Sequence, residues 1–407
     1  MNLDQADIVV VGGGITGLST AYALKQRGYD VVLVEQRFLA FGASGRNSGG
    51  VWVQSMASGP ELDLARNSLR TLHTLEGELG RTFDFATCGG VFFHETEQQA
   101  GILADYAADR RAQGIRAETI TVSEARDMAP GIPDSALGAL SFPDDAKLST
   151  SKLVNGLGQL VRRLGIRVYE NTAALSLIRS GDSVTGIRTV RGNILAGGVV
   201  WCAGPWAANL DSEGIKLPLK LVRVGLLMTQ PIRAHLPAMT RGPLGARHIA
   251  PLRALPSYTP EAFADIEAHR GKPGYEDVVV QGGEGNLYVG HTLDEANSLN
   301  PHITLESSRM MIDTILTRRP EFGELGVTGL WAGIVGRTPD ELPIIDQAEG
   351  LFINTGHSAG VATGLFAGEL MAQMVAAEET TLSLEPFSLA RPGLNTESTE
   401  LYAAGPI

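Results

Sequence analysis

The chain of 407 residues has little cysteine and a shortage of basic side chains. It contains only Cys88 and Cys202, which excludes a disulfide framework and a cysteine-based zinc site and gives no sign of secretion. Acidic residues outnumber basic ones by 45 to 33, so the formal net charge is −12. Because nucleic-acid binding needs a basic surface, this balance argues against a nucleic-acid partner.

Long apolar runs are also missing. The longest weakly polar run, residues 359–377, contains Glu369 and Gln373, and a membrane span would bury that carboxylate at high cost. We therefore interpret this run as a buried helix of a globular protein and expect no stable membrane insertion. The first residues, MNLDQAD, are polar and acidic and lack the pattern of an export signal, so we expect a cytoplasmic location.

The most informative pattern lies in residues 6–50. An apolar run at 8–11 predicts a buried strand, which leads into a complete GxGxxG motif and a helix that ends at Gly28. A second apolar run at 31–34 predicts another buried strand, and Glu35 follows it. An acid about 20 residues beyond such a motif accepts hydrogen bonds from a ribose.

Each part of this unit has a physical role. Gly12 permits a tight turn, Gly14 lets the backbone approach a pyrophosphate, and Gly17 lets the helix pack closely on the strand. The free N–H groups at the helix N-terminus favour a diphosphate. Glycine clusters also form ordinary turns, but strand, glycines, helix, second strand and acid occur here in order, which predicts a dinucleotide site. Its expected contacts are Gly12, Gly14, Ile15, Thr16, Gly17, Glu35 and Gln36.

A loop rich in small residues, FGASGRNSGG at positions 41–50, follows the second strand. Its composition is also typical of a flexible surface loop. Its position at the carboxyl end of a strand favours ligand contact, because ligands of open α/β sheets bind there. Small residues let a flat ring lie against the backbone, and Arg46 and Asn47 offer donors. We predict cofactor contacts from Ser44, Gly45, Arg46, Asn47, Ser48, Gly49 and Gly50.

The GxGxxG–Glu unit followed at once by this loop resembles the FAD-dependent D-amino-acid oxidase superfamily. The similarity is strongest to the branch that holds glycine oxidase, sarcosine oxidases and the catalytic subunits of hydroxyproline and opine dehydrogenases. The resemblance implies that the loop runs from the ribitol and phosphate to the flavin ring. An NAD-dependent enzyme is not expected to carry such a loop here.

Two later stretches, residues 166–206 and 330–376, are similar to the same family. Predicted strands at the start of the first stretch indicate a return to the first domain. The resemblance implies that Ala174 clamps the adenine and that the strand ending near Gly204 packs by the diphosphate. A strand–helix junction in the last stretch would direct a positive helix end at the flavin N1–C2=O edge. The implied contacts are Ala174, Ala203, Gly204, Trp206, Gly333, Gly356, His357, Ser358, Ala359, Gly360 and Val361.

The chain departs from the family at the substrate anchor. The resemblance implies an arginine where Val335 stands, and Arg337 lies two residues later, a spacing that keeps the same face of a strand. The anchor is therefore Arg337 or a residue of the inserted domain, or the substrate lacks a carboxylate. We assign catalytic roles to Arg337, His357 and Arg46. Weaker candidates within the inserted domain are Arg247, His248, Arg253, Tyr258 and His291.

The cofactor expected from the resemblance is FAD, and no metal is expected. The resemblance also implies a cysteine linkage in monomeric sarcosine oxidases, but no cysteine follows Cys202 here, so we expect FAD to be bound non-covalently. We interpret Cys202 as a small buried residue and not a nucleophile.

The fold expected is α/β, with a discontinuous Rossmann-like FAD-binding domain and an inserted substrate domain of mostly antiparallel sheet plus helices. We place the FAD-binding domain at 1–80, 147–215 and 326–380, the substrate domain at 81–146 and 216–325, and a C-terminal tail at 381–407.

The reaction expected is oxidation of the C–N bond of an amino acid or secondary amine, with hydride transfer from the α carbon to flavin N5 and hydrolysis of the imine. The expected partners are the small amine or amino-acid substrate and either oxygen or an electron-accepting protein. A homo- or hetero-oligomer stays open. Two alternatives are a flavin-bearing subunit of a heteromeric amino-acid dehydrogenase, inactive alone, and a flavin hydroxylase. The hydroxylase is disfavoured because Thr338-Pro339-Asp340 stands where a Gly-Asp-Ala strand is expected.

Overall fold

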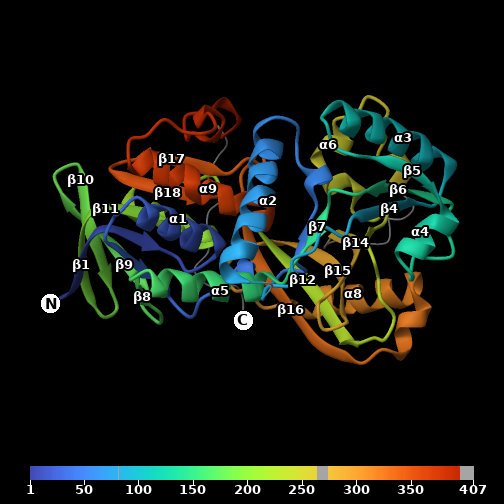
Figure 1. The fold of residues 1–407 in the computed structure, drawn as a ribbon, viewed down its shortest axis with the longest axis horizontal. Coiled ribbons are helices and arrows are strands. Elements are labelled where there is room, and N and C mark those ends of the chain that lie inside the picture. The colour runs from blue at the N-terminus through green and yellow to red at the C-terminus, as the bar shows by residue number, and fades with distance from the viewer. Residues whose placement is uncertain (81, 264–273, 395–407) are drawn as a thin grey trace.

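Two large sheets occupy opposite halves of the molecule in the computed structural model, which describes residues 1–80, 82–263 and 274–394 (Figure 1). The strands of the first sheet are β1 (Asn2–Val11), β2 (Val31–Val34), β8 (Arg167–Tyr169), β9 (Ala174–Ser180), β10 (Ser183–Thr189), β11 (Gly192–Trp201), β17 (Ile344–Ala348) and β18 (Leu351–Thr355). Those of the second are β4 (Gly90–His94), β5 (Glu118–Thr121), β6 (Gly138–Phe142), β12 (Lys220–Pro231), β13 (Met239–Arg241), β14 (Gly274–Gln281), β15 (Asn286–Ala296) and β16 (Val327–Arg337). A short pair, β3 (Gly50–Val51) and β7 (Ala146–Lys147), forms a small third sheet.

The first sheet has a parallel core in the order β18-β11-β1-β2-β8. Strand β17 joins one edge in the antiparallel sense, and the β9–β10 hairpin extends β11. Parallel neighbours need crossover connections, so the chain leaves and re-enters this sheet several times. The returns predicted after residue 166 and after residue 330 are both present.

Helices pack on both halves of the molecule. Their bounds are α1 (Ile15–Gln26), α2 (Pro60–Leu79), α3 (Glu97–Ala112), α4 (Val122–Met128), α5 (Thr150–Arg163), α6 (Ala250–Arg253), α8 (Leu305–Arg318) and α9 (Gly360–Val375). Helix α1 packs against α5 and α9 beside the first sheet, and α2 packs against α9 near the centre of Figure 1. Helices α3, α4 and α8 lie on the second half. The buried helix predicted within 359–377 is confirmed as α9.

Strand β1 shows why both faces of the first sheet are buried. Ile8 and Val10 point into the core that contains α1, α5 and α9. Val9 and Val11 point into a second core, with residues of β10 and of the 3-10 helix η3 (Gly204–Glu213). A strand covered on both faces has a continuous apolar run instead of an alternating one, as residues 8–11 do.

The second sheet runs in the order β16-β12-β15-β14-β13-β4-β6-β5. Its pairings are antiparallel except for β13 with β4. The mostly antiparallel sheet predicted for the inserted part is therefore confirmed. Strand β16 lies in a range that we assigned to the FAD-binding domain, yet it pairs along its length with β12 in the second sheet. The domain boundaries themselves stay a prediction.

The end of the chain packs on the body as far as it is described. Within the predicted tail 381–407, Phe387 is fully buried, and Arg391 donates to both carboxylate oxygens of Asp340 at 2.6 and 2.9 Å. Residues 395–407 lie outside the described part.

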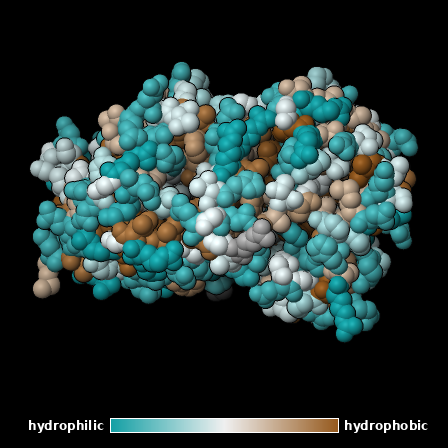
Figure 2. Space-filling view, viewed as in Figure 1, coloured by the Kyte–Doolittle hydropathy of each residue, from teal (hydrophilic) through white to brown (hydrophobic). Residues whose placement is uncertain are grey.

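Hydrophilic side chains predominate on the face shown in Figure 2, where apolar patches are small and scattered. Within residues 1–80, 82–263 and 274–394, no helix has the length and apolar character needed to cross a membrane. The cytoplasmic location stays a prediction.

Candidate active site

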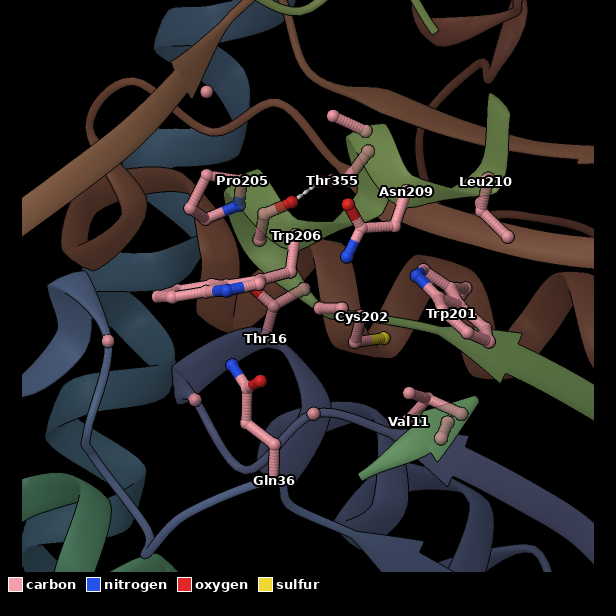
Figure 3. Close-up of a pocket in the computed structure, with 18 of the residues that line it drawn as sticks. Val11, Thr16, Gln36, Trp201, Cys202, Pro205, Trp206, Asn209, Leu210 and Thr355 are labelled. Carbon is pink, nitrogen blue, oxygen red and sulfur yellow. Dashed lines mark hydrogen bonds between the residues drawn. The ribbon is translucent and has the colours of Figure 1, made fainter. Parts of the chain in front are cut away.

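A cavity of about 570 Å³ lies at the carboxyl ends of β1, β2, β11 and β18. Its lining includes the GxGxxG turn, residues 34–36, residues 172–176 and residues 201–206, together with parts of the loop after β2 and of the last third of the chain. In Figure 3, Gln36 and Trp206 project into this space from different elements, and Val11 and Trp201 lie at the ends of β1 and β11. We refer to it as the cofactor cavity.

The glycines of the motif shape this cavity by the side chains that they lack. Gly12 has φ +118°, a conformation that favours glycine, and a Cβ there would overlap the carbonyl oxygen of Cys202. A Cβ on Gly17 would overlap the carbonyl oxygen of Gly12. The turn, the first helix and β11 therefore fit together only without those side chains, as the sequence predicted.

The N-terminus of α1 faces the loop 41–50. The Ile15 N–H donates to Ser44 Oγ at 3.0 Å. The residue at the N-cap position is Gly14, which has no side chain to cap the helix. Ser44 thus lies where the helix dipole favours an anion. Thr16 lines the same space (Figure 3).

Glu35 lies at the end of β2 and is buried. Burial raises the pKa of its carboxyl group, while hydrogen bonds from the Arg37 and Gly13 N–H groups, both 2.8 Å long, oppose that shift. The two oxygens offer about four acceptor positions together, so the carboxylate can still accept a hydrogen bond from a ligand hydroxyl beside those from the backbone. This is the arrangement that a ribose-binding acid requires.

One buried donor in the cofactor cavity has no acceptor. Trp201 Nε1 is inaccessible and has no hydrogen-bond partner among the described residues, although Trp201 lines the cavity. Unpaired buried donors are uncommon, because each costs the desolvation energy of its N–H group. Together with the glycine turn and Glu35, this donor fits a bound dinucleotide such as FAD.

Most predicted cofactor residues border this cavity. Three predicted glycines lie outside its lining and instead allow backbone segments around it to pack closely. The lining includes Gly12, Gly14, Ile15, Thr16, Glu35, Gln36, Ser44, Ala174, Ala203, Gly204, Trp206, Gly356, His357 and Gly360. Gly17, Gly45 and Gly49 do not line it; a Cβ on Gly45 would overlap the Ala40 carbonyl oxygen, and one on Gly49 that of Leu148. Direct contact of these residues with a cofactor stays a prediction.

A second cavity, of about 240 Å³, adjoins the first and lies against the second sheet. We call it the substrate cavity. Predicted residues that border it are Arg46, Asn47, Ser48, Gly50, Gly333, Arg337, Ser358, Ala359 and Val361. The two cavities share Ile15, Ala43, Ser44, Val335, His357 and Gly360. A ligand that fills the first cavity therefore meets a ligand in the second at this boundary.

Arg337 ends β16 and lines the substrate cavity together with Val335, as expected for residues two apart on one strand. Its Nε is buried and has no hydrogen-bond acceptor among the described residues. Glu61, at the start of α2, lies in the same cavity; burial raises the pKa of its carboxyl group to about 7. A guanidinium with an open donor in a partly closed cavity is suited to binding a carboxylate.

The other two residues to which we gave catalytic roles are engaged by the chain itself. Arg46 donates from Nε to the Phe41 carbonyl at 2.8 Å and from Nη1 to the Ala332 carbonyl at 3.1 Å. Both ring nitrogens of His357 are hydrogen-bonded, Nδ1 with Thr363 Oγ1 and Nε2 with Asn354 Oδ1, each at 2.9 Å. These contacts hold the loop and the strand–helix junction in place, and catalytic roles for Arg46 and His357 stay predictions.

Burial lowers the pKa of His357 to about 4, so its imidazole is neutral at neutral pH. It therefore adds no positive charge at the boundary between the two cavities. The N-terminus of α9, at Gly360, lies at the same boundary and contributes positive potential.

A polar network that the sequence did not indicate as a unit crosses the substrate cavity. His291 on β15 joins Ser48 of the loop to Glu276 on β14, and Arg241 on β13 lies 4.0 Å from the Glu276 carboxylate. His291 and His248 are the only weak sequence candidates in the lining described; Arg247, Arg253 and Tyr258 are not part of it.

Arg241, Glu276 and Glu61 were missed. Each lies in a strand or helix where an isolated charge is typical of a solvated face. The signal that identifies them is their burial, which the sequence does not show.

Comparisons with known proteins place the chain among flavoenzymes. The family model described as FAD dependent oxidoreductase matches residues 7–374. The chain is 27% identical over 397 residues to glycine oxidase of Geobacillus kaustophilus, covering 95% of this chain and 97% of that protein. It is 26% identical over 403 residues to sarcosine oxidase subunit beta of Arthrobacter sp., covering 95% and 90%. The crystal structure of the Geobacillus kaustophilus glycine oxidase matches with a TM-score of 0.81 at 23% identity, over 95% and 99% of the two chains.

A further relative is much longer than this chain. The mitochondrial pyruvate dehydrogenase phosphatase regulatory subunit of Mus musculus is 26% identical over 378 residues. The match covers 91% of this chain but only 41% of that protein.

A glycine cradle at the ends of parallel strands, beside a second cavity with charged side chains, is typical of an enzyme that binds a dinucleotide. The family-model match makes the class specific: the chain belongs to the FAD dependent oxidoreductase family. As a member of that family it is an FAD-dependent oxidoreductase.

Proposed function

We propose that the enzyme oxidises the C–N bond of an amino acid or an N-substituted amino acid and that Arg337 binds the substrate carboxylate. Two observations carry this proposal: Arg337 lines a cavity that adjoins the cofactor cavity, and its buried Nε has no hydrogen-bond acceptor among the described residues. Arg337 would thereby replace the arginine that the family resemblance implies at the position of Val335. The names of two relatives, glycine oxidase and sarcosine oxidase subunit beta, support a small amino-acid substrate.

The residues of the chain supply position and exclusion of water. Arg337 holds the carboxylate at one end of the substrate cavity, and Val335 and Leu226 provide apolar wall beside it. This arrangement would keep the substrate Cα at the boundary between the cavities, because both reacting groups must meet there. Bound FAD would supply the two-electron acceptor for the hydride of that carbon. Hydrolysis of the resulting imine needs only water.

FAD would be held by the Gly12–Gly17 turn at its diphosphate and by Glu35 at its ribose. We propose non-covalent attachment, because the single buried thiol of this region is unreactive: burial raises the pKa of Cys202 to about 12. Its Sγ lies 3.8 Å from Thr20 Oγ1, inside the core.

A second candidate is a flavin-bearing subunit that passes electrons to a partner and is inactive alone. The name of the sarcosine oxidase subunit beta, of whose length the match covers 90%, supports this candidate. The two candidates differ in the electron acceptor, oxygen or a protein, and not in the first half-reaction.

The test is anaerobic mixing of the purified FAD-loaded protein with sarcosine, glycine, proline and an opine, followed by the visible absorbance of the flavin. We expect at least one of these amines to bleach the flavin, and acid precipitation to release FAD into the supernatant. A colourless protein, or flavin that no amine bleaches, contradicts the proposed function. Flavin retained in the acid pellet contradicts non-covalent attachment. Bleaching without peroxide formation under oxygen favours the partner-dependent subunit.

A further inference from the structure

Three side chains from separate segments form a hydrogen-bonded line along the substrate cavity. Ser48 Oγ lies 3.2 Å from His291 Nε2, and His291 Nδ1 lies 3.1 Å from Glu276 Oε2. The side chains of His291 and Glu276 are each only 14% exposed, and all three residues line the cavity. The line therefore connects the loop beside the flavin position with the second sheet.

The charge state of Glu276 fixes the position of the imidazole proton. Burial alone would raise the pKa of Glu276, but the hydrogen bond with His291 and the charge of Arg241 hold that pKa well below its usual range. An ionised carboxylate only accepts hydrogen bonds. His291 Nδ1 must therefore carry the proton that it donates to Glu276, and in this tautomer the lone pair of the imidazole is on Nε2, which faces Ser48 Oγ.

Arg241 lies beside Glu276, the residue of this line farthest from Ser48, and is itself held in place by two contacts. Its Nη1 donates to Ser55 Oγ at 2.7 Å, and its guanidinium lies 4.9 Å from the centre of the Trp52 ring. These contacts keep Arg241 beside Glu276, where its charge favours the carboxylate form.

Charged and titratable groups from every neighbouring element face this part of the cavity. Besides Glu276 and Arg241, they are Arg46 and His357 at the flavin side, His248 beside α6, Glu61 on α2, Arg337 at the end of β16 and Glu341 in the loop after it. Among them only Glu276 hydrogen-bonds to His291. An imidazolium formed at His291 would be stabilised by that adjacent carboxylate.

The proposed reaction requires a proton acceptor at this place. Amino acids carry an ammonium group at neutral pH, and a C=N bond forms only when the nitrogen has a lone pair to donate. We infer that His291 is the base that removes a proton from the substrate ammonium, and that Glu276 is the positioning residue that fixes its tautomer. This inference rests on the proposed function. It assigns to the site a substrate bound in its ammonium form, with its carboxylate on Arg337.

The step balances in atoms and electrons. An ammonium N–H bond breaks, its electron pair stays on nitrogen, and a new N–H bond forms at His291 Nε2. The α C–H bond then breaks, and its electron pair leaves with the hydrogen as hydride to the flavin, which is the oxidant. The nitrogen lone pair forms the C=N bond, and water hydrolyses the iminium.

The test uses full-length FAD-loaded protein and the pH dependence of anaerobic flavin bleaching by the amine found active. His291→Asn keeps a donor near the Nδ1 position but removes the base. We expect the bleaching rate at pH 7 to fall by about 10²-fold or more, the usual contribution of a general base. The rate should be regained as the pH rises toward the range in which the free amine forms in water. His302→Asn, which removes an imidazole that lines neither cavity, should not move the profile.

A second variant, Glu276→Gln, leaves His291 in place and is nearly the same size as the wild type, so it tests the inference even if His291→Asn fails to fold. In Glu276→Gln the acid limb of the profile should move to lower pH, because the imidazolium loses the carboxylate that stabilises it. A wild-type profile in both His291→Asn and Glu276→Gln overturns the inference while leaving the proposed function in place. Wild-type flavin that no amine bleaches overturns the proposed function itself.

Discussion

The two cavities of this enzyme are built in different ways. The cofactor cavity is shaped largely by backbone, through glycines and the ends of strands. Its carboxylate, Glu35, accepts hydrogen bonds from the backbone N–H groups of Gly13 and Arg37. The substrate cavity is shaped by charged side chains that meet across strands β13 to β16. Backbone sites depend on local sequence, whereas side-chain sites depend on how distant segments are brought together. The first is therefore specified more by local sequence, and the second is where we propose that the substrate is selected.

The largest effect should come from the glycine cradle. Gly17→Ala introduces a Cβ that overlaps the Gly12 carbonyl oxygen, so the turn must move away from α1. We expect FAD affinity to fall by about 100-fold, the equivalent of losing about 3 kcal/mol of aligned contacts. The measurement is the dissociation constant of FAD by fluorescence titration of the apoprotein.

Gly77→Ala is the matched control for that variant. Gly77 is also helical, but nothing lies within 4 Å of a Cβ built there. It should bind FAD normally and be slightly more stable, since alanine favours a helix. Equal FAD affinity in both variants would contradict a cradle defined by close backbone packing.

An intermediate effect should come from the substrate anchor. Arg337→Ala removes the charged donor that we assign to the substrate carboxylate, and charge-assisted hydrogen bonds contribute about 1.5–3 kcal/mol. We expect the substrate dissociation constant to rise by about 10- to 100-fold with FAD retention unchanged. Saturation of the anaerobic bleaching rate measures it. Arg253→Ala is the control, because Arg253 pairs with Glu341 at 3.4 Å but does not line the cavity. If Arg337→Ala loses FAD, Arg337 also supports the cofactor cavity, and the claim that the two cavities act separately is wrong.

The smallest effect concerns pH. Burial raises the pKa of Glu61 to about 7, so this group becomes a carboxylate as the pH rises through that value. It then competes for Arg337 and repels a bound carboxylate. We expect a carboxylate ligand without an amine to bind about fivefold more weakly at pH 8 than at pH 6, which corresponds to about 1 kcal/mol for one added like charge.

Titration of acetate or propionate against the flavin spectrum measures that change. Glu61→Gln should bind these ligands equally well at both pH values. A pH dependence that persists in Glu61→Gln would assign the effect to another group.

The difference between the cavities also explains how much could be predicted. The buried strands, the GxGxxG turn and Glu35 follow from contiguous residues, so the sequence pattern located them and the family resemblance indicated FAD. The placement of β16 in the second sheet was not predicted, because pairing with β12 depends on a partner about 100 residues away. Arg241 and Glu276 were missed for the same reason: each is a charged residue on its own strand, and only the sheet brings the two strands beside His291.

Asp145 is a further instance of burial that the sequence conceals. Paired acids in a proline turn are typical caps, yet the Asp145 side chain is almost completely buried and burial raises the pKa of its carboxyl group to about 8. A turn sequence does not show whether its side chains point outward or into the core.

The most direct test of the account pairs two enzymes with two substrates in anaerobic bleaching. Wild type and Arg337→Ala are each mixed with sarcosine and with dimethylamine, which lacks the carboxylate. If Arg337 binds the carboxylate, removing either partner weakens binding to a similar degree, and removing both costs little more than removing one. If Arg337→Ala weakens sarcosine and dimethylamine equally, the arginine does not bind the carboxylate and the account of the substrate cavity is wrong.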